Sequence, residues 1–380
     1  MAKRTLYRGG ALFDGARLLP EAGLLLDDAG RVLALGNGAF EAEADASVEL
    51  GGDILCPGFV DLQVNGGGGV MFNDAPTVET LATIAEAHIG LGTAAILPTL
   101  ITDTAEQTRA AIAAAVAAVE AGVPGIAGLH LEGPHLSVAR KGAHSAGLIR
   151  PMEEADLAAL LAAAEALPAL MITVAPENTT PEQVRALAQA GAIVSLGHTD
   201  ADYDTAMAYQ QAGAACVTHL FNAMSQLGNR APGVVGAALD NGGLAAGLIA
   251  DGIHVHRAAI RAAWGAKQGP APIFLVTDAM APAGTDQRSF TLNGREIRRE
   301  GGRLTLADGT LAGADLDLVT ALGVLHREVG VPLEDALRAA TSAPADVAGL
   351  SHLGRVQVGE RAPLLRIAGD LSGCGWVVRP

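Results

Sequence analysis

Eight short apolar runs alternate with helical stretches along most of this 380-residue chain, and that alternation constrains its fold more than any other feature. The runs lie at 58–64, 93–98, 126–132, 170–175, 192–198, 215–219, 246–251 and 273–278. The intervening helices are expected at 77–91, 104–121, 153–167, 181–190, 201–212 and 256–267. This pattern is typical of parallel strands joined by helices. Eight strands favour an α/β fold, a (β/α)8 TIM-like barrel, over an open sheet.

The two ends of the chain differ from its middle. Residues 1–55 and 354–380 contain short strand patterns and tight turns, and neither is long enough to fold alone. We therefore expect one small β-sandwich domain formed by both termini, with the barrel occupying residues 56–353. The segment 284–312 has hairpin character, and Thr180 and Asp200 are expected to be helix N-caps.

The charge excludes several classes of partner. The net charge is −16, so a nucleic-acid partner and an anionic membrane surface are not expected. The three cysteines are far apart and form no C-x-x-C, which indicates a reducing compartment. The first residues lack the apolar core of a signal peptide. A cytoplasmic location is the resulting expectation.

Three residues with ligand-type side chains each end a separate predicted strand: Glu132, His198 and His219. In a barrel, the carboxyl ends of the strands converge, and catalytic groups lie there. A lone histidine is more often structural, but three ligand types at three strand ends favour a metal site. Imidazole nitrogens with one carboxylate suit zinc or ferrous iron, and three ligands leave a position for water.

Asp278 ends the last predicted strand and is the candidate general acid/base, since a carboxylate beside an activated water can accept and return its proton. Gln63 and Asn65 end the first strand, with one residue between them. Neutral amides are poor ligands for transition metals, so these are at most vestigial second-metal positions. His130 shares the inward face of its strand with Glu132 and is a candidate for supporting that ligand.

Three further residues lie on loops that follow predicted strands. His144 is placed to contact a sugar hydroxyl or the scissile carbonyl, and a surface-loop histidine is the alternative interpretation. Arg230 and His254 follow the sixth and seventh strands, where barrels often bind phosphate. Arginine binds phosphate through paired hydrogen bonds. An ordinary surface charge is the alternative for Arg230.

Several longer motifs together resemble one known family. They are Pro57-Gly-Phe-Val-Asp-Leu-Gln-Val-Asn-Gly-Gly-Gly-Gly69, Leu97-Pro-Thr-Leu-Ile-Thr102, Gly128-Leu-His-Leu-Glu-Gly-Pro134, Lys141-Gly-Ala-His144, Gly197-His198, Thr218-His-Leu-Phe-Asn-Ala-Met224, Ala250-Asp-Gly-Ile-His254, Val276-Thr-Asp-Ala279 and Gly309-Thr-Leu-Ala-Gly313. With these motifs, nearly the whole chain resembles the N-acetylglucosamine-6-phosphate deacetylase family of the amidohydrolase superfamily.

This resemblance implies hydrolysis of N-acetyl-D-glucosamine 6-phosphate to D-glucosamine 6-phosphate and acetate, in amino-sugar catabolism. It implies that Glu132, His198 and His219 bind one divalent metal per subunit, zinc or alternatively iron(II), and that Asp278 is the acid/base. It further implies substrate contacts through the residues His144, Asn222, Ala223, Arg230 and His254. The last two would bind the phosphate across a homodimer interface, near the active site of the partner. Gln63 is typical of single-metal members.

Two of the positions that depart from the family pattern bear on the predicted site, and other functions stay open. His135 replaces an aromatic residue and would place an extra weak ligand near the site. Asp315 replaces a small hydroxyl residue, so a carboxylate close to the phosphorylated sugar would alter substrate preference. The alternative functions are a deacetylase for N-acetylgalactosamine 6-phosphate, a cyclic-amide hydrolase, and a non-catalytic barrel that binds sugar phosphates.

Overall fold

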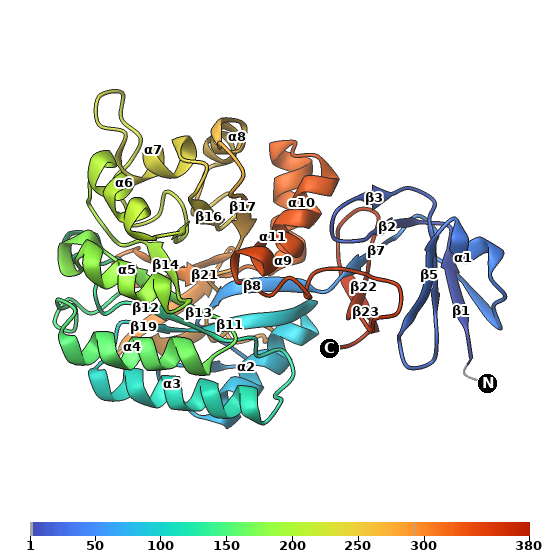
Figure 1. The fold of residues 1–380 in the computed structure, drawn as a ribbon, viewed down its shortest axis with the longest axis horizontal. Coiled ribbons are helices and arrows are strands. Elements are labelled where there is room, and N and C mark those ends of the chain that lie inside the picture. The colour runs from blue at the N-terminus through green and yellow to red at the C-terminus, as the bar shows by residue number, and fades with distance from the viewer. Residues whose placement is uncertain (1–2, 293) are drawn as a thin grey trace.

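The computed structural model describes residues 3–292 and 294–380, and its centre is a barrel of eight parallel strands with helices outside it (Figure 1). The strands follow sequence order, each hydrogen-bonded to the next. They are β8 Phe59–Val64, β11 Thr93–Ile101, β12 Leu129–Glu132, β13 Leu170–Val174, β14 Ile193–Leu196, β15 Cys216–Val217, β16 Ala245–Leu248 and β17 Ile273–Leu275. Each lies in or overlaps one predicted run. The predicted (β/α)8 fold class is confirmed.

The first and last strands meet only near their carboxyl ends. There, Val64 forms a parallel bridge with Ala279, and the backbone N–H of Asp278 donates to the carbonyl of Gln63 at 3.0 Å. The seam between β8 and β17 is therefore closed at the end of the barrel where the candidate site residues lie. Two short strands, β9 Gly66–Gly67 and β10 Val70–Met71, follow this seam.

The outer helices pack through small or apolar faces. They are α2 Val78–Gly90, α3 Ala105–Glu120, α4 Glu154–Ala166, α5 Pro181–Gln189, α6 Tyr203–Ala212, α7 Gly233–Asp240, α8 Arg257–Ala266, α9 Leu318–Gly323 with the π-helix η3 Val324–Val329, α10 Leu333–Ala340 and α11 Ser342–Val347. Short 3-10 turns, η1 Val138–Arg140 and η2 Pro176–Asn178, lie in the loops. Helix α7 is missing from the sequence prediction because it is buried over most of its length and shows no amphipathic period.

One of the two predicted N-caps is confirmed and the other is wrong. The side chain of Thr180 accepts from the N–H of Gln183, with Pro181 in the first turn of α5. Helix α6 is capped by Asp202, whose carboxylate accepts from the N–H of Thr205 at 2.8 Å. Asp200 lies outside α6 because its carboxylate accepts from Arg140 Nε at 2.8 Å.

The two chain ends form two separate sheets beside the barrel, at the right of Figure 1. One sheet has the order β5-β4-β1-β6 and the other β23-β22-β7-β2-β3. Their strands are β1 Thr5–Arg8, β2 Ala11–Phe13, β3 Leu18–Leu19, β4 Gly23–Leu26, β5 Val32–Gly36, β6 Ala46–Glu49, β7 Ile54–Pro57, β22 Leu364–Ile367 and β23 Cys374–Val378, with the short helix α1 Gly38–Glu41. Leu24, Leu55, Val356 and Leu364 share one apolar cluster, so both termini contribute to its core. The proposed domain boundaries at 55 and 354 stay a prediction.

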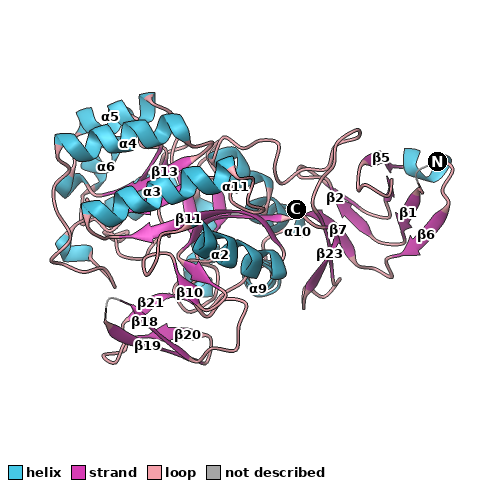
Figure 2. Ribbon diagram, turned by 90° about the horizontal axis from the view of Figure 1, so that it is seen from below, coloured by secondary structure: helices cyan, strands magenta, loops and turns pink. Residues whose placement is uncertain are grey.

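The segment after β17 forms a four-stranded antiparallel sheet that Figure 2 shows as a separate layer at one side of the barrel. Its strands are β18 Ser289–Leu292, β19 Arg295–Glu300, β20 Arg303–Thr305 and β21 Leu311–Ala314. Phe290, Ile297 and Leu304 pack with Ile101 and Met280 of the barrel. We call β18–β21 and their connections the insert sheet. Among the described residues, no helix has the length and apolar character needed to cross a membrane.

Candidate active site

Three candidate site residues adopt left-handed backbone conformations directly after their strands. The φ angles are +47° at His198, +32° at His219 and +53° at Asp278. Non-glycine residues avoid this region, and each such residue costs roughly 1–3 kcal/mol, which the surrounding structure must offset. Strain of this kind concentrates at functional sites, and here it turns three polar side chains into the mouth of the barrel.

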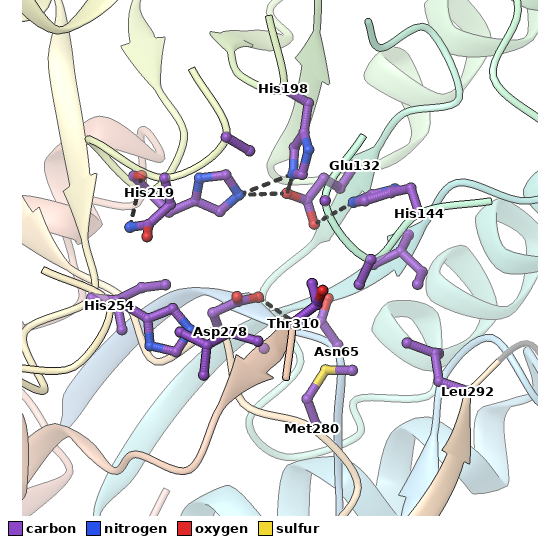
Figure 3. A pocket seen from close by; sticks show the side chains of 18 of the residues that line it. Asn65, Glu132, His144, His198, His219, His254, Asp278, Met280, Leu292 and Thr310 are labelled. Atoms are coloured by element: carbon purple, nitrogen blue, oxygen red, sulfur yellow. Dashed lines mark hydrogen bonds and ion pairs between the residues drawn. The ribbon is translucent and has the colours of Figure 1, made fainter. Parts of the chain in front are cut away.

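Glu132, His198 and His219 bring three ligand atoms together (Figure 3). Oε1 of Glu132 lies 3.1 Å from Nε2 of His198 and 3.0 Å from Nε2 of His219, and the two nitrogens are 3.2 Å apart. Tetrahedral ligands at about 2.0–2.1 Å from zinc lie roughly 3.3 Å from one another. The triangle of donors therefore fits a tetrahedral divalent ion, and a fourth position stays open.

Hydrogen bonds fix which nitrogen of His198 carries its proton. Nδ1 of His198 lies 2.8 Å from the carbonyl oxygen of Arg140, so the N–H donates there and Nε2 keeps its lone pair for a ligand. Burial alone would raise the pKa of Glu132, but the adjacent imidazoles of His198 and His219 hold it well below its usual range. The pKa of His219 is raised because the bond and charge of Glu132 outweigh burial.

Asp278 faces this triad from the opposite side of the cavity and is supported by two amides. Its Oδ1 accepts from Nδ2 of Asn65 at 2.7 Å and from Nε2 of Gln63 at 3.2 Å. The same nitrogen of Gln63 lies 3.3 Å from Oε1 of Glu132. Both amides thus donate to Asp278, and the amide of Gln63 also lies between the two carboxylates. Burial and the charge of Glu132 raise the pKa of Asp278 to about 6.

His144 lies on the other flank of Glu132, and its Nε2 is 3.8 Å from Oε2 of that carboxylate. Its Nδ1 accepts from the backbone N–H of Thr102 at 3.3 Å and contacts the Thr102 hydroxyl at 2.8 Å. The ring proton therefore lies on Nε2, on the side that faces the cavity. Burial and the neighbouring His198 lower the pKa of His144 to about 3, so the ring is a neutral donor.

The site opens into a cavity of about 420 Å³. Barrel residues form its floor, and the insert sheet forms one wall. The lining residues are Asn65, Ile101, Glu132, Gly142, Ala143, His144, His198, His219, Asn222, Ala223, Ile249, His254, Asp278, Met280, Leu292, Gly309, Thr310, Leu311 and Gly313. A cavity of this size suits one small-molecule ligand and combines apolar walls with a few convergent polar groups.

The candidate substrate-binding residues divide into two groups. Asn222, Ala223 and His254 line the cavity, and Nδ1 of His254 donates to Oδ2 of Asp251 at 2.6 Å, which orients the ring. Arg230 is exposed on the loop between β15 and α7, outside the cavity lining of its own chain.

The two expected departures lie away from the cavity. His135 lines a different cavity, between α3 and α4, and its Nδ1 contacts the carbonyl of Arg150 at 3.1 Å. Asp315 forms a two-point ion pair with Arg299, both distances being 2.8 Å. Neither side chain lines the cavity that contains Glu132, and the effects of His135 on metal binding and of Asp315 on substrate preference stay predictions.

Three contributions to the site were missed from the sequence. Asp251 orients His254, Thr102 orients His144, and Leu292, Thr310 and Leu311 of the insert sheet line the cavity. The motif Gly309-Thr-Leu-Ala-Gly313 contains two of these lining residues, and it was the sequence feature from which their place at the site could have been predicted. Asp251 and Thr102 also lie in motifs quoted above, Ala250-Asp-Gly-Ile-His254 and Leu97-Pro-Thr-Leu-Ile-Thr102, but the motifs do not state which histidine each residue orients.

Comparison with known proteins agrees with this geometry. The profile of the amidohydrolase family matches residues 54–373. The chain is 45% identical to an N-acetylgalactosamine-6-phosphate deacetylase of Shewanella, over 81% of this chain and 77% of that protein. It is 35% identical to an N-acetylglucosamine-6-phosphate deacetylase of Haemophilus influenzae, over 87% of each.

Solved structures give the same result over the full length. The N-acetylglucosamine-6-phosphate deacetylase of Pasteurella multocida superposes with a TM-score of 0.91 at 35% identity, covering 99% of this chain and 98% of that one. A mutant of the Mycobacterium smegmatis enzyme, in complex with N-acetyl-D-glucosamine-6-phosphate, gives 0.90 at 32% identity, covering 99% and 100%. The chain therefore belongs to the amidohydrolase family and, within it, to the group of N-acetylhexosamine-6-phosphate deacetylases.

Proposed function

We propose that this protein hydrolyses N-acetyl-D-glucosamine 6-phosphate to D-glucosamine 6-phosphate and acetate. The observation that carries the proposal is the triangle of ligand atoms from Glu132, His198 and His219, with the carboxylate of Asp278 facing it. The family membership supports the substrate class. A non-catalytic binding barrel is not favoured, since a sensor needs neither the three ligands nor a buried base.

Glu132, His198 and His219 would bind one divalent ion, and we propose zinc, with iron(II) as the alternative. When bound, such an ion supplies a water that ionises near neutral pH and a positive charge for the developing oxyanion. Asn65 and Gln63 occupy one oxygen of Asp278, which leaves the other oxygen for the reaction. The paired amides also explain why one ion, not two, is proposed.

The protein groups account for the proton transfers. Asp278 accepts a proton from the attacking water as the water oxygen bonds to the acetamide carbon. The neutral His144 donates its Nε2–H to the carbonyl oxygen, where negative charge develops. As the C–N bond breaks, Asp278 passes its proton to the departing amine nitrogen. The acetic acid formed then gives up its proton to the amine, so the products are acetate and the protonated amine.

The phosphate is proposed to bind His254 and Arg230, the latter from a second subunit. Arg230 lies outside the cavity of its own chain, so it can serve a cavity only if a homodimer brings it to the partner's site. Size-exclusion chromatography with light scattering tests the dimer. Arg230→Ala should raise KM for the phosphorylated sugar about tenfold and leave kcat within about threefold.

The direct test is acetate release by purified protein after chelation and after addition of zinc or iron(II). The substrates are N-acetylglucosamine 6-phosphate, its galactosamine epimer and unphosphorylated N-acetylglucosamine. Metal-restored turnover with a strong preference for the phosphorylated glucosamine derivative is the expected result. Faster turnover of the epimer, which the Shewanella relative's name describes, would reassign the substrate. Absence of metal-dependent turnover with all three would refute the proposal.

A further inference from the structure

A continuous row of polar side chains crosses the barrel interior just beneath the ligand residues. Oγ of Ser195 lies 2.6 Å from Oγ1 of Thr218, which lies 2.7 Å from Oγ1 of Thr173. Oγ1 of Thr173 lies 2.8 Å from Nε2 of His130, and Nδ1 of His130 lies 3.3 Å from Oγ1 of Thr99. These five residues come from five consecutive strands or strand ends, β11 to β15, and all are buried. We call them the polar row.

The hydrogen bonds of the polar row run in one direction. The Thr99 hydroxyl donates to the carbonyl of Leu97 at 3.2 Å and accepts from the N–H of Val64 at 2.9 Å. With its proton used there, Thr99 receives the Nδ1–H of His130. Nε2 of His130 is then an acceptor for Thr173, which accepts from Thr218.

Ser195 donates to Thr218 and completes the series. Each hydroxyl thus donates once, and the imidazole both donates and accepts, so the row leaves none of its own protons without a partner. Aligned hydrogen bonds in a dry interior strengthen one another, and a fully satisfied network specifies one arrangement of its strands. The row is too well connected to be explained as scattered buried hydroxyls.

The row touches the backbone segments that carry the three ligands. Thr218 immediately precedes His219, and His130 precedes Glu132 by two residues on the same face of β12. Ser195 precedes His198 by three residues, with Leu196 and Gly197 between them. A Cβ on Gly197 would come within 2.8 Å of Thr173 and 2.9 Å of Thr218, so both threonines press against the turn that leads to His198.

We propose that the polar row is a positioning device that sets the separations of the three ligand atoms, with Thr173 as its central member. The inference rests on the proposed metal site and goes beyond it. His198 and His219 sit in left-handed turns that a relaxed chain would leave. Because the row connects the strands just below those turns, it restrains both histidines relative to Glu132. Outer groups of this kind typically change metal affinity by about 10- to 100-fold.

Thr173→Val is the central test because valine keeps the shape of threonine and removes its hydroxyl. It deletes the donor to His130 and the acceptor for Thr218 together. We expect the Kd for zinc, measured by competition with a chromogenic chelator, to rise at least tenfold. Thr173→Ser, which keeps the hydroxyl, should bind zinc within about twofold of the wild-type protein.

Thr341→Val is the matched control for losing a buried hydroxyl. Thr341 is fully buried at the end of α10 and donates to the carbonyl of Leu337 at 2.7 Å, outside the polar row. We expect it to lower the Tm by an amount similar to Thr173→Val and to leave the Kd for zinc unchanged. If both variants lower the Tm and only Thr173→Val raises the Kd for zinc, the effect on zinc binding comes from positioning of the ligands and not from lower stability.

The outcomes distinguish this inference from the proposed function. If the wild-type protein binds neither zinc nor iron(II), the metal site itself is refuted, and the positioning role falls with it. If the wild-type protein binds zinc and Thr173→Val binds it within twofold, the positioning role is overturned and the metal site stands. If Thr173→Val does not fold, Ser195→Ala decides by the same measurement. It removes only the first donor and should weaken zinc binding at least threefold, and an unchanged Kd would overturn the inference.

Discussion

Nδ2 of Asn65 lies 2.7 Å from Oδ1 of Asp278, and this contact joins the end of the first barrel strand to the turn after the last one. The amide donates to the carboxylate and so favours its ionised form. Burial and Glu132 act in the opposite direction and raise the pKa of Asp278 to about 6. The balance places the carboxyl near the range in which a group can both accept and return a proton.

Asn65→Ala should therefore shift the pH dependence of the reaction. Asp278 must be ionised to accept a proton, so kcat/KM falls as the pH drops through its pKa. A bound cation also favours the carboxylate, which puts the acid limb of the metal-loaded wild-type enzyme at or below about pH 6. Loss of the Asn65 donor should move the midpoint of the acid limb to a higher pH, by about one pH unit. A pH profile of kcat/KM from 4.5 to 9 checks this, and an unmoved limb would show that Asn65 does not tune Asp278.

Asp278→Asn should separate catalysis from metal binding. The amide keeps the size of the side chain and cannot accept the proton of the attacking water, so we expect kcat to fall about 10²- to 10⁴-fold. Metal content, measured by elemental analysis, should stay near the wild-type value because the three ligands are untouched. A variant that is metal-loaded and still active would show that the assigned role is wrong.

The arrangement of the site was predictable because its main residues lie at the ends of predicted strands. Glu132, His198 and Asp278 each close an apolar run, and the barrel brings such positions together whatever their distance in sequence. The structure places the predicted metal candidates within hydrogen-bond distance of one another. Their roles stay predictions until the measurements above are made.

Features set by tertiary contact were not predictable from local patterns. The pairing of Asp315 with Arg299 depends on how the insert sheet packs, and no short motif encodes it. Helix α6 is capped by Asp202 and not by the predicted Asp200, because the Asp200 carboxylate accepts from Arg140, 60 residues away in the sequence. Helix α7 was missed since burial over most of its surface removes the amphipathic signal.

Glu132→Gln should abolish stabilisation by zinc. An ion that binds only the folded protein stabilises it by about 2.7 kcal/mol at a hundredfold excess over its Kd. We expect zinc to raise the Tm of the wild-type protein and not that of the variant, because the amide is a poor ligand. His135→Asn is the control, since His135 lines a separate cavity, and its zinc response should equal that of the wild type. If the His135 variant instead lost the response, His135 would be a ligand after all.

Asp61 should make the stability of the protein depend on pH. It is fully buried and accepts from the Thr277 hydroxyl at 2.5 Å, and burial raises the pKa of its carboxyl from 3.8 to about 7. The unfolded chain therefore loses this proton near pH 4, whereas the folded protein keeps it up to about pH 7. The contribution of this group to stability is thus complete below pH 4 and disappears as the pH rises to 7.

Asp61→Asn cannot titrate and should remove that dependence. A carboxyl pKa raised from 3.8 to about 7 corresponds to a change on the order of 4 kcal/mol in the free energy of unfolding between pH 4 and 7. Urea denaturation of both proteins at pH 4.5, 6 and 7.5 measures the difference between them. We expect the free energy of unfolding of the variant, relative to that of the wild-type protein, to increase from pH 4.5 to 7.5. A difference that does not change with pH would mean that Asp61 stays ionised when folded.

Asp315→Ser tests whether the ion pair with Arg299 acts on the insert sheet or on substrate choice. The pair joins β19 to the segment after β21, and Arg299 Nη1 also donates to the carbonyl of Thr285 at 2.6 Å. Serine leaves Arg299 without its anion, and we expect a loss of about 1 kcal/mol in stability. Since Leu292, Thr310 and Leu311 of the same sheet line the cavity, KM should rise severalfold.

The preference between the glucosamine and galactosamine substrates should stay within about twofold of the wild-type ratio, because Asp315 lies outside the cavity lining. Glu296→Gln is the matched control, since it removes an exposed ion pair with Arg298 on the same sheet and should change neither KM nor stability measurably. The measurement is kcat/KM for both epimers with all three proteins. A changed epimer ratio in Asp315→Ser alone would mean that the carboxylate influences the sugar despite its pairing, through the position of the insert sheet.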